Sequence, residues 1–260
     1  MNEDAKERMP SMAERRPQAL RIGDRTAPLP IIQGGMGVGV SLSGPASAVA
    51  NEGGIGVIAT AGIGMIEADL FKNFAAANLR ALRKEIRRAR ELSKGILGVN
   101  IMVALTNFGE LVKTALDEGI DIIFSGAGLP LDLPHFRRGG DPTKLVPIVS
   151  SGRAARIIAK RWIERYDYPP DAVVVAGPRA GGHLGFKPEQ LADPTHALAL
   201  INAQRGRMRH GFAFAGENAH RATEILSVKD LVATLLDEYH AAQGQDLQPV
   251  EAGLLVCLSA

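Results

Sequence analysis

The sequence predicts an α/β fold, a TIM-barrel-like parallel (β/α) barrel that is incomplete or irregularly closed. Three observations support this prediction: short apolar runs alternate six times with helical stretches, each run ends near glycine or serine, and the alternation stops after Pro194. Such alternation places helices outside a parallel sheet and gathers the strand ends on one face. The 260-residue length permits a barrel, which typically needs about 250 residues.

Composition narrows the class of protein. The formal net charge is only +2, and the basic residues gather on one helical stretch and near the N-terminus, which disfavours a nucleic-acid binder. Cys257 is the only cysteine, so we expect no disulfide, no metal site and a reducing, cytoplasmic setting. The charged residues 1–18 predict a flexible tail rather than a secretory signal, and no apolar run approaches the length of a membrane span.

The first repeats predict a barrel strand followed by a glycine turn. A small hairpin is expected around Gly23-Asp24, followed by a first core strand over Pro30–Ile32 that ends in Gln33-Gly34-Gly35-Met36. A small-residue helix is then predicted over Ser41–Gly53 and a second strand over Ile55–Thr60.

The next segment predicts a long helix and a strand that contains an amide. Apolar residues at helical spacing indicate a helix over Met65–Lys94, whose charges are read as a solvated face, with a functional basic patch as the less favoured alternative. Asn100 interrupts the apolar strand Ile96–Met102, and a buried amide must find partners. It is either a satisfied core residue or a ligand contact, and its place near the carboxyl end of the strand favours the ligand.

Three more units complete the repeats. Asn107 is predicted to cap a helix over Phe108–Glu118, and strands are predicted over Ile120–Phe124 and Lys144–Val149. A helix over Arg153–Tyr166 should place Trp162 inward before Pro169-Pro170 stops it.

The sixth strand, Ala172–Ala176, is entirely apolar and is predicted to be buried on both faces. Beyond it, Gly181-Gly182 would let backbone N–H groups approach a ligand, and His183 follows directly. A histidine exchanges a proton near neutral pH, since its ordinary pKa is about 6.5. From these residues alone, a catalytic histidine and an ordinary turn histidine remain equal alternatives.

Five strand-end motifs in order resemble the nitronate monooxygenase family: PIIQGGMGVGVS, GVNIM, SGAGLP, PIVSS and AGGHLGF, spread over residues 20–194. The resemblance implies an FMN-dependent barrel in which His183 is the catalytic base facing the substrate. It also implies that the cofactor contacts are Gln33, Gly34, Gly35, Met36, Asn100, Ser125, Ser150, Gly181 and Gly182. Arg179 departs from the pattern and is expected to point to solvent rather than to an anion.

The implied activity is the oxidation of alkyl nitronates, or of nitroalkanes deprotonated by His183, with oxygen to carbonyl compounds and nitrite. An FMN-dependent enoyl-[acyl-carrier-protein] reductase and a poorly active, internally deleted remnant are the alternatives. No nucleic-acid or membrane partner is expected.

A larger departure follows Pro194, where the last two strand–helix units of the resembling family are missing. The predicted organisation is therefore a tail at 1–18, an FMN-binding barrel portion at 19–194 and a helical tail at 195–260. Phe212–Ala215 or Gly253–Leu258 could pair with the open edge beside the sixth strand, or two copies could dimerise there. Since barrel phosphates usually bind loops after strands seven and eight, we expect weak FMN binding.

Overall fold

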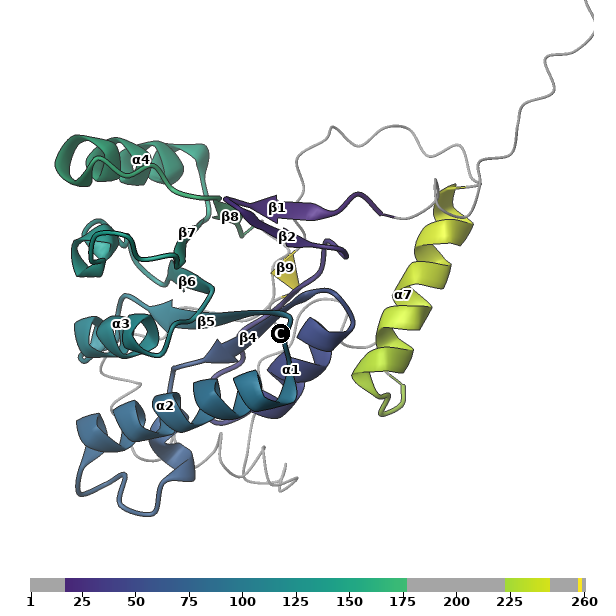
Figure 1. The fold of residues 1–260 in the computed structure, drawn as a ribbon, viewed down its shortest axis with the longest axis horizontal. Helices are drawn as coiled ribbons and strands as arrows, with labels where there is room; N and C mark the ends of the chain where they lie inside the picture. Colours follow the sequence, from purple (N-terminus) through teal and green to yellow (C-terminus); the bar gives the residue numbers. More distant parts are fainter. Residues whose placement is uncertain (1–16, 177–222, 244–256, 259–260) are drawn as a thin grey trace, which may run out of the picture.

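The computed structural model describes residues 17–176, 223–243 and 257–258 (Figure 1). The elements in chain order are β1 (Leu20–Ile22), β2 (Arg25–Ala27), β3 (Ile32–Gln33), α1 (Ser43–Asn51), β4 (Ile55–Ala59), η1 (Ile63–Ile66), α2 (Phe74–Leu92), β5 (Ile96–Met102), α3 (Phe108–Asp117), β6 (Ile122–Gly126), η2 (Leu133–Phe136), β7 (Lys144–Val149), α4 (Gly152–Tyr166), β8 (Val174–Val175), α7 (Val228–Gln243) and β9 (Cys257–Leu258).

The main sheet confirms the predicted fold class. Its strand order is β8-β7-β6-β5-β4-β3-β9, and all neighbouring pairs are parallel. Strands β3 to β8 follow one another in sequence order and form a curled half of a (β/α) barrel, with helices along its outer side (Figure 1). The barrel is incomplete within the residues that the structure describes.

The outer face of the sheet holds the larger core. Ile58, Leu97, Val99 and Ile123 pack there against apolar side chains of α1, α2, α3 and α4. Helix α1 lies so close to β4 that a Cβ on Gly56 would be 1.8 Å from the Ala46 carbonyl oxygen. Only glycine permits this approach, which sets the distance between the first helix and the sheet.

The inner face of the sheet is closed at one end by the β1–β2 hairpin, which confirms the hairpin predicted around Gly23. Ile22 and Ala27 of the hairpin belong to one buried cluster with Ile55, Val57 and Phe124 of the sheet. The hairpin precedes β3 and covers the amino ends of the strands, so the carboxyl ends remain for a site.

Three helix predictions need correction. The helix expected over 65–94 is divided into η1 and α2, because residues 67–73 turn between them and the Asn78 side chain accepts the Gly64 N–H at 2.9 Å. Asn107 stands at the start of α3 but makes no capping bond, and its buried Nδ2 has no partner in the described part of the chain. The helix predicted at 41–53 is shorter at both ends.

The sixth strand was predicted to be buried on both faces, and this prediction is wrong. Strand β8 has only two residues, and while Val174 is buried, Val175 is 53% exposed. The reason is its position, because β8 is the last strand of the sheet in the described ranges and pairs there only with β7. An apolar run therefore does not by itself place a strand inside a sheet.

The C-terminal candidate strand pairs at the other edge from the one expected. Cys257 and Leu258 form β9, which lies parallel to Ile32 and Gln33 of β3 rather than beside β8. The other candidate, Phe212–Ala215, lies outside the described residues, and the predicted domain boundaries stay predictions.

Helix α7 lies against α1, and no helix in the described ranges is long and apolar enough to cross a membrane.

Candidate functional site

The carboxyl ends of β3 to β7 form the edge where the predicted site residues gather. Because all these strands are parallel, their following loops leave from one edge of the sheet. Gln33 ends β3, Asn100 lies near the end of β5, and Ser150 follows β7. Gly181, Gly182 and His183, like Arg179, lie outside the described residues, so their roles stay predictions.

Gly35 and Asn100 are brought into direct contact. A Cβ built on Gly35 would lie 2.7 Å from the Asn100 Cβ and 3.1 Å from its Cγ, so no larger residue fits at position 35 without movement. These residues are 65 positions apart in the sequence, and both were predicted to contact the same cofactor.

The backbone of Asn100 is fixed from the neighbouring strand. Its carbonyl oxygen accepts the Thr60 N–H at 3.0 Å and the Thr60 hydroxyl at 2.9 Å. The hydrogen bonds that join Asn100 to other described residues all involve its backbone, and its side chain is half-buried. Asn100 also shares its register with Phe124, whose side chain packs on the inner face of the sheet. The amide is thus held on the barrel interior with its polar atoms unused.

Gln33 has a structural partner. Its Oε1 accepts the Val57 N–H at 3.1 Å, in place of a backbone carbonyl of β3. The side chain extends the β3–β4 pairing by one bond where the two strands part. Contact between Gln33 and a cofactor stays a prediction.

The loop between Gly34 and Leu42 folds back onto β4. The Val38 N–H donates to the Ala61 carbonyl at 2.7 Å, and the Ala59 N–H donates to the Ser41 carbonyl at 2.9 Å. The Ser41 hydroxyl accepts the Met36 N–H at 3.0 Å and donates to the Gly34 carbonyl at 3.2 Å. Sequence reasoning did not identify Ser41 as a site residue, although it closes the first motif.

The two serines predicted as cofactor contacts have different surroundings. Ser125 is 0% exposed, and its hydroxyl donates to the Ile101 carbonyl at 2.9 Å, on the helix-facing side of the sheet. Ser150 is exposed at the end of β7, while its neighbour Ser151 caps α4 by accepting the Ala154 N–H. Ser125 is therefore not brought together with Asn100, and cofactor contact by either predicted serine stays a prediction.

Of the three non-glycine residues with left-handed backbone in the described part of the chain, two lie at the same edge, and the third, Asp167, ends α4 away from it. Val38 has φ = 51° in the loop after β3, and Ala127 has φ = 52° directly after β6. Residues with side chains rarely adopt this left-handed region, at a cost of about 1–3 kcal/mol, and such residues cluster at functional sites. Their positions give an independent indication that this edge is the site.

Two of the groups with shifted pKa values lie at the opposite edge of the sheet. Burial, followed by the hydrogen bond to Asp171, raises the pKa of the Tyr168 phenol, and a hydrogen bond from Lys144 lowers the pKa of Asp24. Both groups lie near the amino ends of the strands, in the loop before β8 and in the β1–β2 turn. The described side chains at the carboxyl edge, Gln33, Asn100, Ser125 and Ser150, carry no charge.

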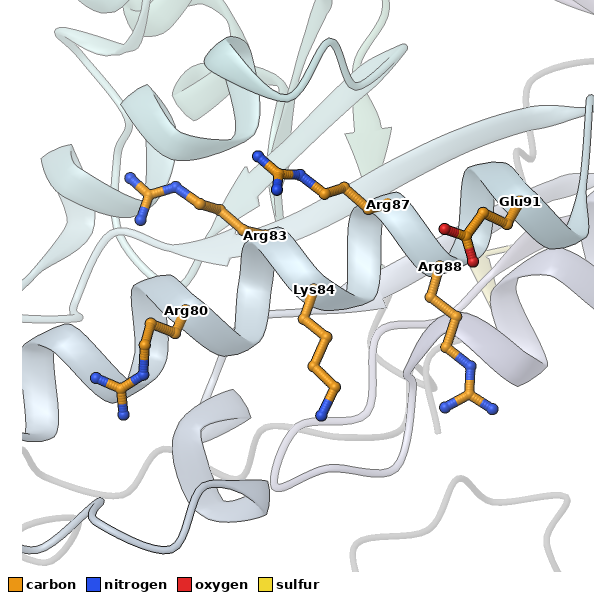
Figure 2. Close-up of a pocket in the computed structure, with 6 residues that line it drawn as sticks. All are labelled: Arg80, Arg83, Lys84, Arg87, Arg88 and Glu91. Carbon is orange, nitrogen blue, oxygen red and sulfur yellow. The ribbon is translucent and has the colours of Figure 1, made fainter.

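The outer face of α2 is the strongest alternative surface. Figure 2 shows its basic side chains, which are Arg80, Arg83, Lys84, Arg87 and Arg88, together with Glu91. Three of them are paired, because Arg80 bonds Glu67 and Asp69 while Arg83 and Arg87 share Glu118. Most of the positive charge is therefore neutralised, which fits the solvated face predicted from the sequence.

The chain is similar to several known proteins. The sequence profile described as "NMO: Nitronate monooxygenase" matches residues 23–205, more than half of the chain. A dehydrogenase from Mycobacterium tuberculosis, named for (3aS,4S,5R,7aS)-5-hydroxy-7a-methyl-1-oxo-octahydro-1H-indene-4-carboxyl-CoA, is 27% identical over 159 residues, which are 60% of this chain and 38% of that protein.

Two solved structures are also similar. FabK from Thermotoga maritima is 30% identical, with a TM-score of 0.46 over 60% of this chain and 43% of that one. Nitroalkane oxidase from Streptomyces ansochromogenes is 24% identical, with a TM-score of 0.46 over 61% of this chain and 49% of that one. The chain thus spans less than half the length of each of these three relatives.

Proposed function

The chain belongs to the nitronate monooxygenase family, and on that premise we propose that it is a flavin-dependent oxidoreductase that oxidises alkyl nitronates. The cofactor proposed is FMN, bound at the carboxyl edge of β3 to β7. The observation that supports this placement best is the contact between Gly35 and Asn100, because it joins two of the predicted cofactor contacts across three strands.

The described residues fit the polar edge of a flavin ring. Neither the Gly35 N–H and carbonyl nor the Asn100 amide bonds another described residue, so they can offer donors and acceptors to a ligand. A flavin ring carries both kinds of group along one edge. The uncharged character of Gln33 and Asn100 also suits a neutral ring.

The protein residues would bind, orient and move one proton, while bound flavin would accept the electrons. We propose that His183 takes the proton from the carbon beside the nitro group of a neutral nitroalkane, which yields the nitronate. Two nitronates and one oxygen molecule would then give two carbonyl compounds and two nitrite ions, so that both oxygen atoms are accounted for. Oxygen as co-substrate, a cytoplasmic location and an assembly of two copies belong to this proposal.

Flavin titration and a product assay test the proposal together. Purified protein titrated with FMN should quench flavin fluorescence, with an affinity weaker than nanomolar, and should release nitrite from an alkyl nitronate in air. Protein that takes up no flavin would contradict the cofactor. Flavin uptake with nicotinamide-driven reduction of an enoyl thioester and no nitrite would contradict the nitronate substrate.

His183→Ala tests the base. Turnover of the neutral nitroalkane should fall by about 100-fold or more, as is usual when a general base is lost. Turnover of the preformed nitronate needs no deprotonation and should fall much less. Equal loss on both substrates would show that His183 binds or orients the substrate instead.

A further inference from the structure

Ser41 is buried, with 4% of its surface exposed, and all its polar groups are used, the N–H and hydroxyl within the loop after β3 and the carbonyl by β4. Its N–H donates to the Met36 carbonyl at 2.9 Å, and its hydroxyl accepts the Met36 N–H at 3.0 Å, so residues 36 and 41 are joined in both directions. The same hydroxyl donates to the Gly34 carbonyl at 3.2 Å. The Ser41 carbonyl accepts the Ala59 N–H, which ties this ring to β4.

These bonds determine where the polar groups of Gly35 point. A peptide unit is planar and trans, so its carbonyl and its N–H point in opposite directions. The Gly34 carbonyl points to the Ser41 hydroxyl, and therefore the Gly35 N–H of the same unit points away from Ser41. The Met36 N–H also points to that hydroxyl, and therefore the Gly35 carbonyl points away as well.

Gly35 thus presents a donor and an acceptor on the side away from Ser41, and neither has a partner among the described residues. We propose that Ser41 is a positioning residue that fixes the Gly34–Met36 backbone, so that Gly35 offers this pair of groups to the flavin. The inference rests on the proposed function. Ser41 itself would not contact the cofactor.

Serine suits this position because a hydroxyl can donate one hydrogen bond and accept two in a small volume. Alanine would leave the Met36 N–H and the Gly34 carbonyl without their partner and free both peptide units to rotate about Gly35. Val38 and Gly39 have left-handed backbone, which is unfavourable for Val38. The hydrogen bonds of Ser41 hold this turn in place, and without them Val38 would tend to return to an ordinary backbone conformation.

The matched control is Ser47, which has the same chemistry and burial but lies in α1. It is also 4% exposed, and its hydroxyl donates to the carbonyls of Ser43 and Gly44 within the helix. Ser47→Ala should lower stability through a lost buried hydrogen bond without changing the loop after β3.

The experiment measures FMN affinity by fluorescence quenching, the visible absorption band of the bound flavin at saturation, and thermal unfolding of the flavin-free protein. Ser41→Ala should weaken FMN binding by about tenfold or more, which is roughly the effect of losing one hydrogen bond between uncharged groups. The visible absorption band of the bound flavin should also shift. Ser47→Ala should leave affinity and band as in wild type, even if both variants unfold at similarly lower temperatures. Ser41→Thr keeps the hydroxyl and should restore most of the affinity.

Three results would overturn the inference. FMN binding by Ser41→Ala with wild-type affinity and spectrum would show that the loop needs no hydroxyl. Equal weakening in Ser47→Ala would show an effect of stability alone. Wild-type protein without FMN uptake would contradict the proposed function itself and, with it, the role of Ser41. The first result, in which the wild type takes up FMN and Ser41→Ala is unaffected, would contradict the Ser41 inference alone. Should Ser41→Ala not fold, Ser41→Cys, nearly the same size but a weak donor, replaces it with the same expected loss.

Discussion

At the level of single residues, the site depends both on the absence of a side chain at Gly35 and on the presence of the Asn100 side chain. The Asn100 Cβ occupies the space that a side chain on residue 35 would need. Glycine is therefore required at position 35 for a steric reason, in addition to the backbone freedom that it gives. Steric fit between distant residues is a property that can be measured by a double-mutant cycle.

We expect Gly35→Ala to destabilise the protein by about 1–3 kcal/mol, as overpacking does, and to weaken flavin binding. Asn100→Ala keeps the Cβ and should not relieve the clash with a Cβ at position 35, whereas Asn100→Gly should relieve it. The double variant Gly35→Ala/Asn100→Gly should therefore lose less stability than the sum of its two single changes. Urea unfolding of the variants measures this coupling. Gly44→Ala is the control, because a Cβ there meets nothing within 4 Å. Additive effects at positions 35 and 100 would show that the contact is not tight.

At the scale of elements, α4 is fastened to the loop after β6 by one carboxylate. Asp132 accepts the Tyr166 hydroxyl at 2.6 Å and pairs with Arg161 at 3.2 Å and Arg165 at 3.7 Å. Trp162, fully buried as predicted, donates its indole N–H to the Pro130 carbonyl beside this cluster. The hydrogen bond from Tyr166, then those from Arg161, lower the pKa of Asp132.

A lowered pKa in the folded protein means that the Asp132 carboxylate stabilises the fold above its unfolded pKa of about 4. That contribution is lost as the pH falls through the folded pKa. We expect Asp132→Asn to reduce the free energy of unfolding at pH 7 by about 1 kcal/mol or less, since the carboxylate is half exposed, and the difference from wild type to shrink below about pH 4. Urea unfolding at a series of pH values tests this.

Asp117→Asn is the matched control for Asp132→Asn. Asp117 pairs with the exposed Arg138 alone among the described residues, so we expect almost no change in stability at any pH. A difference between Asp132→Asn and wild type that persists unchanged at low pH would show that the carboxylate charge is not what stabilises α4.

At the scale of the whole molecule, the half-barrel has two unlike edges. Strand β3 is covered by β9, which follows it by more than 220 residues in the sequence, while β8 pairs on one side only among the residues that the structure describes. Because β3 leads directly into the loop that contains Gly35 and Ser41, the pairing with β9 supports the site from the side away from β4.

Removal of residues 253–260 should therefore loosen β3. Hydrogen–deuterium exchange should become faster in peptides that cover residues 30–36, because the pairing of Ile32 and Gln33 with β9 is lost. Peptides from the β1–β2 hairpin serve as the internal control, since that hairpin pairs only with itself. Unchanged exchange at residues 30–36 would show that β9 does not protect β3.

The sequence alone determined the class of fold and most of its elements. The apolar runs of β5 and β7 coincide with the predicted strands, and the helical spacing of α4 placed Trp162 in the core, because burial of apolar side chains sets both periodicities locally. Asn100 could also be chosen in advance, since a lone amide in an apolar run is visible in the sequence, and Gly35 could be chosen because its motif resembles the family.

Only the tertiary structure decided which residues meet. The contact of Gly35 with Asn100, the closure of the loop by Ser41, the use of the Ser125 hydroxyl by Ile101 and the pairing of β9 with β3 all join segments that sequence spacing does not relate. The exposure of Val175 is of the same kind, because its apolar run looks the same at an edge as in the middle of a sheet. Strand order and register are set by packing over the whole chain, and so they fix the partners of each polar group only once the fold has formed.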